Sequence, residues 1–130
     1  MTADRTSRAL GIAASVILVL TAALHGMAWP AVSQAAQAPA ASLMAQTFLQ
    51  PLWLFPVATW LALAAAVALQ MRQPDRRTRS TLIAIGAAPL LQALALFAFV
   101  GHFVGAYALL LAGTLIWLSA AAMPGQRALV

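Results

Sequence analysis

The placement of arginine between apolar segments constrains this chain more than any other feature. Four apolar segments follow one another, and all 7 Lys and Arg residues are arginines on one side of that pattern. They precede the first segment, separate the second from the third, and follow the fourth: Arg5, Arg8, Arg72, Arg76, Arg77, Arg79 and Arg127. Because basic loops of membrane proteins stay in the cytoplasm, this pattern predicts four membrane spans with both termini cytoplasmic.

Composition supports a membrane protein of a single domain. Apolar residues make up 64% of the chain and charged residues 7%, whereas a soluble domain carries about a quarter charged residues. The segments are apolar all the way round, so they lack the polar face that a soluble helix bundle needs. We therefore predict an all-α fold over residues 1–130, an integral membrane bundle of four transmembrane helices arranged up-down-up-down. Its spans are expected at about 9–29, 51–71, 81–100 and 105–123.

Charge and cysteine content exclude several classes of function. The net charge of +5 comes from arginines at the ends of the apolar segments, where each contact with an anionic headgroup is worth about 1 kcal/mol. Membrane lipids are therefore the expected partners, and nucleic acid is not, because no aromatic residues interleave the basic stretches. Cysteine is absent, which excludes disulfides and iron–sulfur clusters. The alanine-rich, lysine-free composition fits a GC-rich bacterial genome, so we predict the bacterial inner membrane.

The first segment has an alternative interpretation as a signal peptide, with a cleavage site near Ala36-Gln37-Ala38. We favour a retained helix, because its apolar run approaches the roughly 20 residues that span a bilayer. The next ten residues, from Pro30, are predicted to be loop. The stretch from Ser42 is interpreted either as a short interfacial helix or as a flexible loop, and Pro51 is expected in the first turn of the second span.

No Asp or Glu lies in any predicted span, since Asp4 and Asp75 are both on the cytoplasmic side. This excludes carboxylate-dependent chemistry within the membrane. It also separates the chain from small multidrug transporters, which depend on a buried carboxylate. The ionisable groups that remain in or beside the membrane are His25, His102 and Tyr107.

Two histidines are the main candidates for a binding site. Helical spacing places His25 on one face with Gly11, Ser15, Leu18, Ala22, Gly26 and Trp29, and His102 on one face with Ala84, Ala88, Leu91, Ala95 and Ala98. If both faces point inward, the imidazoles meet near the outer end of the bundle. There they can ligate haem iron or a transition metal, or bind a quinone or another small ligand beside Trp29, Trp53 and Tyr107.

Their depths argue against a shared metal. His25 lies about 25 Å beyond Arg8 and His102 about 34 Å beyond Arg79 along their helices, whereas both ligands of one metal need bonds of about 2 Å. We therefore assign no metal and no cofactor. The favoured interpretation is that His25 hydrogen-bonds a neighbour within the bundle and that His102 faces water at the turn.

Other polar and aromatic residues have structural interpretations. Gln92 lies near the bilayer midplane and is predicted to join helices by a hydrogen bond, with a pore lining as the alternative. Trp60 and Trp117 are expected to pack against alanine-rich neighbours, with the wall of a ligand pocket as the alternative. Pro89 predicts a kink, and Gly101 and Gly105 allow a tight chain reversal. Hydroxyl groups are expected to bond their own helix backbone at Ser15, Thr21, Thr59, Thr114 and Ser119.

The layout resembles small bacterial four-span membrane proteins of unassigned role, of which the DoxX-like group is an example. The shared features are cytoplasmic termini, a longer first outer connection and the His25-Gly26 pair near the first outer end. The resemblance covers the architecture of the whole chain, and no functional residue is carried over from it.

Three functions remain open from the sequence. The first is a non-catalytic accessory or oligomer-forming subunit, with a second copy or another membrane protein as its partner. The second is binding of a small ligand, haem or quinone near His25 and His102. The third is a small transporter or channel. We predict no enzyme, because no set of nucleophile, base and orienting group can be assembled.

Overall fold

The computed structural model describes residues 2–72 and 77–123, and throughout this part of the chain the only regular structure is helical. Its helices are α1 (Thr2–Gly26), α2 (Trp29–Ala36), α3 (Leu43–Arg72), α4 (Thr78–Phe99) and α5 (Val104–Ala121). The predicted all-α class is therefore confirmed. Three residues used in the sequence analysis lie outside the described residues: Asp75, Arg76 and Arg127.

Four helical stretches are long and apolar enough to cross a membrane. They are Arg5–Ala36, which joins α1 to α2, then Leu43–Arg72, Thr78–Phe99 and Val104–Ala121. Leucine and alanine dominate these stretches, and both residues favour helix. In a bilayer a helix also satisfies every backbone polar group internally. The chain is thus a multi-pass membrane protein by the length and composition of its helices.

The connection between the first two spans was predicted wrongly. Residues 29–36 form helix α2 where a loop was expected, and α3 begins at Leu43 and runs unbroken to Arg72. The short helix proposed from Ser42 and the second span are therefore one helix. Ser42 caps it, since its Oγ accepts a hydrogen bond from the backbone N–H of Ala45 at 3.2 Å. Pro51 lies inside this helix rather than in its first turn.

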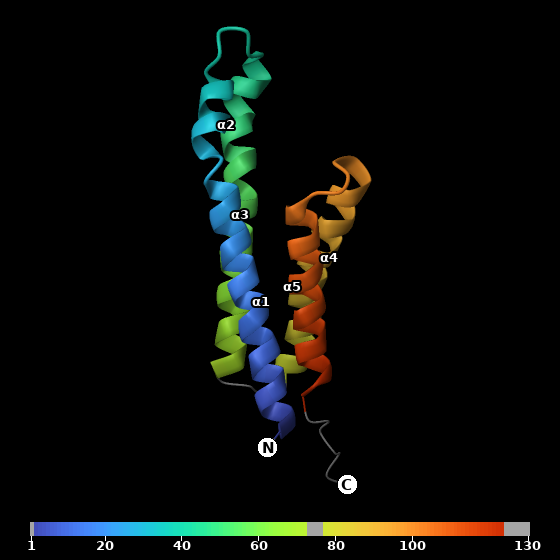
Figure 1. Cartoon of the computed structure of the whole chain (residues 1–130). Coiled ribbons are helices and arrows are strands. Elements are labelled where there is room, and N and C mark those ends of the chain that lie inside the picture. The colour runs from blue at the N-terminus through green and yellow to red at the C-terminus, as the bar shows by residue number, and fades with distance from the viewer. Residues whose placement is uncertain (1, 73–76, 124–130) are drawn as a thin grey trace.

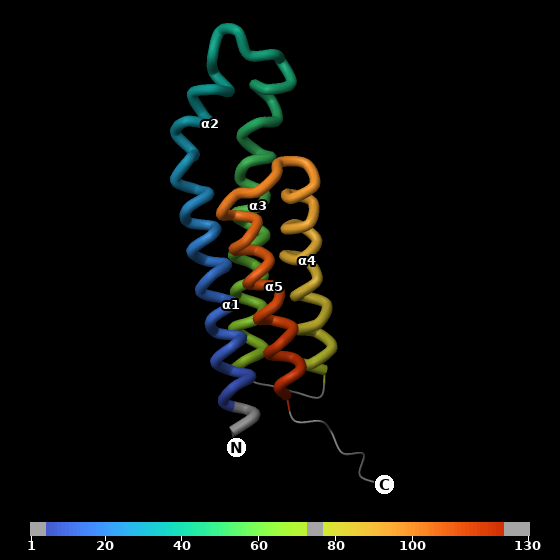
Figure 2. The backbone as a smooth tube through the Cα atoms, turned by 45° about the vertical axis from the view of Figure 1, so that its right-hand side comes forward, coloured from blue at the N-terminus to red at the C-terminus, as the bar shows by residue number. Residues whose placement is uncertain are grey.

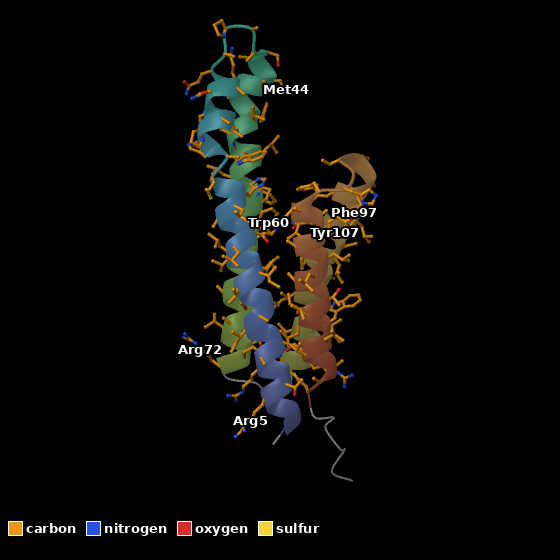
Figure 3. All side chains as sticks on the ribbon, in the orientation of Figure 1. Arg5, Met44, Trp60, Arg72, Phe97 and Tyr107 are labelled. Carbon is orange, nitrogen blue, oxygen red and sulfur yellow. The ribbon has the colours of Figure 1, made fainter. Side chains whose placement is uncertain are left out.

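Two helical hairpins make up the molecule (Figure 1). Helix α1 packs against α3 and also against α5, and α4 packs against α5, but α3 and α4 share little contact. The start of α1 and the ends of α3 and α5 lie at one end, which carries Arg5 and Arg72 (Figure 3). At the other end α2 and the start of α3 rise beyond α4 and α5 (Figure 2). This follows from length, since the 30 residues of α3 span about 45 Å and the 18 of α5 about 27 Å.

The hairpins are joined at the arginine-bearing end by a buried polar contact. Ser7 Oγ donates to the Ser119 carbonyl at 2.8 Å, and Ser119 Oγ donates to the Ser7 carbonyl at 2.7 Å. Close approach here requires a small residue at position 11, because a Cβ on Gly11 would lie 2.7 Å from the Met71 side chain. The prediction that Ser119 bonds its own helix is therefore wrong. The hydroxyls of Thr21, Thr59 and Thr114 do bond their own helices.

Helices α4 and α5 approach each other at two glycines. A Cβ on Gly86 would lie 2.5 Å from Trp117 Cδ1, and a Cβ on Gly113 would lie 2.6 Å from Leu90 Cγ and 3.0 Å from the Gly86 carbonyl. Trp117 packs across α4 as predicted, and its indole N–H donates to the Ile83 carbonyl at 3.0 Å. Small residues that let helix backbones approach closely are the usual means of packing in membranes.

The buried faces agree with prediction for α1 and disagree for α4. In α1 the buried residues include Gly11, Ser15, Leu18 and Ala22, which all lie on the predicted face. In α4 the buried residues are Thr78, Leu82, Gly86, Pro89 and Ala93. The face predicted for α4 is instead largely exposed, with Ala84, Leu91, Ala95, Ala98 and His102 all exposed and Ala88 half-buried. Alanine recurs on every side of α4, so its pattern could not indicate which side packs inward.

We predict that Gly113→Ala lowers the free energy of unfolding by about 1–3 kcal/mol, the usual effect of overpacking. The new methyl group would press on Leu90 and on the backbone of Gly86. Unfolding in mixed micelles of increasing SDS content, followed by far-ultraviolet circular dichroism, measures this change. Gly26→Ala is the matched control, because a Cβ on Gly26 would meet nothing within 4 Å. Equal effects of the two substitutions would contradict the close α4–α5 contact.

Candidate functional site

A cavity of about 680 Å³ lies between the two hairpins, in the half of the molecule away from the arginines. All four membrane-spanning stretches line it. Its wall is mostly aliphatic and aromatic, and the side chains that add polar atoms are Thr21, His25, Gln92, Trp53 and Trp60. No Asp, Glu, Lys or Arg belongs to this wall. A concave apolar site with a few polar groups is the usual form of a small-molecule site.

His25 and two tryptophans form one side of the cavity. The His25 ring stacks on Trp53 with 3.9 Å between centroids and 11° between planes, and it meets Trp60 edge-on at 5.2 Å. The Trp53 indole N–H donates to the His25 backbone carbonyl at 3.1 Å. This carbonyl, in the last turn of α1, also accepts a hydrogen bond from the Ala28 backbone N–H at 3.2 Å. The hydrogen bond from Trp53 and the ring stacking join the end of α1 to α3.

The His25 imidazole is not tied into the bundle by a hydrogen bond at its Nε2. This nitrogen is buried and has no hydrogen-bond partner, the one such side-chain atom in the described part of the chain. Leaving a buried polar atom unpaired costs about 1–3 kcal/mol. The expected hydrogen bond from His25 to a neighbour is therefore absent at this atom, and aromatic contacts hold the ring instead.

Gln92 crosses from α4 to α3 inside the cavity. Its Oε1 accepts a hydrogen bond from the Trp60 indole N–H at 2.6 Å. Trp60 is 5% exposed and belongs to the core, and Figure 3 shows it on α3 between the two hairpins. The prediction that Gln92 joins two helices is confirmed. The bond matters because α3 and α4 share little other contact.

His102 belongs to a second cluster outside the cavity. Its Nδ1 lies 2.9 Å from the Tyr107 hydroxyl, and its ring packs against Phe97 with 5.6 Å between centroids. Phe97 and Tyr107 lie at the upper end of α4 and α5 (Figure 3). His102 and Tyr107 are both exposed. Gly101 makes the preceding turn with a φ of 93°, which a glycine adopts easily.

The structure thus separates the residues that the sequence grouped as one site. His25 and Trp53 line the cavity, whereas His102 and Tyr107 form the second cluster and Trp29 lies half-buried at the start of α2. Within residues 2–72 and 77–123, no ring contact joins the two histidines. No group of three or more metal-ligating side chains occurs in the same described ranges.

The sequence analysis favoured packing roles for Trp60 and Gln92 over membership of the site. A signal for Trp60 was present, because Trp53, Pro56 and Trp60 are spaced three and four residues apart and so share one helix face. All three line the cavity. For Gln92 a lining role was only the alternative, since its partner is on a different helix and 32 positions away.

Comparison with known proteins yields no match: no protein-family model, no curated protein and no solved structure is significantly similar to this chain. The resemblance to the DoxX-like group therefore stays a prediction.

Proposed function

We propose that this chain is a non-catalytic membrane protein that binds an uncharged, mainly apolar small molecule in the cavity between its hairpins. The observation that carries this proposal is the cavity of about 680 Å³ itself, with aromatic walls and no charged residue among those that line it. A ligand with a net charge would lose its hydration there without a counter-ion. The membrane is the natural source of the ligand, because an apolar molecule concentrates in it.

The cavity provides binding rather than catalysis. Its titratable residue is His25, and the ring of His25 is packed against two indoles. A catalytic site needs a base within hydrogen-bond reach of the reacting group and a second group that orients it. The cavity wall contains neither a nucleophile with an adjacent base nor a carboxylate. Its side chains therefore favour binding of a ligand over catalysis.

We expect Ala108→Phe, which places a ring in the cavity, to weaken binding of a hydrophobic probe about tenfold, or about 1.4 kcal/mol. The probe is 1-bromododecane, whose bromine quenches the fluorescence of Trp53 and Trp60 when it enters. The titration is made on the purified protein in micelles of a non-ionic detergent. Ala84→Phe is the matched control, because Ala84 is exposed on α4 and does not line the cavity. Equal quenching in both variants and the wild type would refute the proposal.

We also propose an up-down-up-down topology in the bacterial inner membrane, with both termini cytoplasmic. Its support is the position of the described arginines, since Arg5, Arg8, Arg72, Arg77 and Arg79 all lie near the ends of α1, α3 and α4 and are exposed. Clusters of arginine on one side of the spans keep that side cytoplasmic.

The cysteine-free sequence makes this topology easy to test. Single cysteines at Ser42 and Ser80, both exposed, report the two opposite sides. In intact spheroplasts a membrane-impermeant maleimide is expected to label Ser42→Cys fully and Ser80→Cys only after the membrane is opened. Labelling of both positions in intact cells would contradict the topology.

A role as an accessory or oligomer-forming subunit is a second candidate. It is favoured by apolar side chains on the part of α3 that rises beyond the α4–α5 hairpin, where Leu43 is 80% and Met44 72% exposed. A partner protein or a second copy would cover them. We expect a stable assembly after purification in a mild detergent, measured by native mass spectrometry. A monomer without partners would count against this role and leave ligand binding untouched.

A further inference from the structure

The orientation of the Gln92 amide decides which polar group the cavity offers to a ligand. The indole N–H of Trp60 can only donate a hydrogen bond, so the amide must turn its oxygen toward Trp60. The amide nitrogen then carries two N–H donors on its other side. The Gln92 side chain makes no further hydrogen bond in the described chain, and its nitrogen is not buried. Since Gln92 lines the cavity, these donors are accessible from it.

The other polar side chains of the cavity wall add few hydrogen-bond donors to those of Gln92. The Thr21 hydroxyl uses its proton on the Ile17 carbonyl at 2.8 Å. The Trp60 indole N–H is used on Gln92, and the Trp53 indole N–H on the backbone of His25. His25 Nε2 is covered by its surroundings. The Gln92 amide is therefore the main side-chain donor left for a ligand.

The start of α5 adds donors of the same kind at the end of the cavity. Val104 and Gly105 line it, and they are the first residues of a helix whose N-cap, Phe103, makes no side-chain capping bond. The first N–H groups of a helix have no partners within it. Two residues of the cavity wall, Val104 and Gly105, thus carry backbone N–H groups that have no acceptor within α5.

We infer that the cavity selects an uncharged lipophilic molecule with a carbonyl oxygen, which accepts a hydrogen bond from the Gln92 amide. This inference rests on the proposed ligand-binding function and names the chemical class of the ligand. A carbonyl is an acceptor without a proton of its own, so it can pair with an N–H of the amide and brings no further donor into the apolar wall. The ester of a membrane lipid and a free ketone or quinone share this chemistry.

Matched competitors test this selectivity. Dodecane and 2-dodecanone have the same chain length, and each is titrated against bound 1-bromododecane until tryptophan fluorescence recovers. In the wild-type protein we expect the ketone to compete about two- to tenfold better than the alkane after correction for micelle partition, the range for one hydrogen bond. Gln92→Leu should abolish this advantage, so that the ketone and the alkane compete equally.

Two further variants distinguish loss of carbonyl recognition by Gln92 from damage to the fold. Trp60→Phe keeps the Gln92 amide but frees it to rotate, so the advantage of the ketone over the alkane should become smaller. Gln70→Leu, at a glutamine outside the cavity, should keep the full advantage. If ketone and alkane compete equally in the wild type, the inference is overturned and ligand binding stands. If neither competes, the proposed function itself fails.

The source of the carbonyl is distinguished in nanodiscs by the ¹⁵N-labelled side-chain NH₂ signal of Gln92, identified by its loss in Gln92→Leu. A signal position that differs between diester and diether lipids without added ketone assigns the carbonyl to a membrane lipid. A shift that appears only on addition of 2-dodecanone assigns it to a free carbonyl compound. No shift under either condition overturns the inference.

Discussion

The contact of α1 with α5 is the interaction on which the rest of the structure depends. Helices α3 and α4 share little contact, so the two hairpins are joined mainly through α1 and α5. At the arginine-bearing end, Ser7 and Ser119 exchange two hydrogen bonds between side chain and backbone. In a membrane the hydrophobic effect does not drive helices together, so hydrogen bonds and close packing of small residues decide where they associate.

The two hairpins contact each other closely at the arginine-bearing end and enclose a cavity nearer the opposite end. The cavity lies between the hairpins away from the Ser7–Ser119 contact, and the rings of Trp53 and Trp60 on α3 line one side of it. The Trp60–Gln92 bond then spans the opening between α3 and α4. It has a second effect, because it fixes the amide and so determines that the cavity presents donors. One hydrogen bond therefore links the packing of the bundle to the chemistry of the site.

The sequence predicted the spans better than the faces that they bury. The buried face of α1 was predicted correctly because the small residues Gly11 and Ser15 stand out in an apolar run. In α4 alanine lies on every side, and the face predicted to be buried was the wrong one. His102, which was assigned to that face, lies instead on an exposed turn. The position of Pro51 within its helix was also predicted wrongly. A proline usually begins a helix, yet within a membrane helix it is tolerated when neighbouring groups satisfy the freed carbonyl.

By itself the sequence determined the all-α class and the number of helical stretches long enough to span a membrane. These follow from composition and from runs of apolar residues, which are local properties of the chain. Only the tertiary structure decided which polar residues meet. His25 and His102 belong to different clusters, and Gln92 reaches Trp60 across 32 positions. The reason is that a site between helices depends on their rotation and spacing, which are set by packing between distant residues.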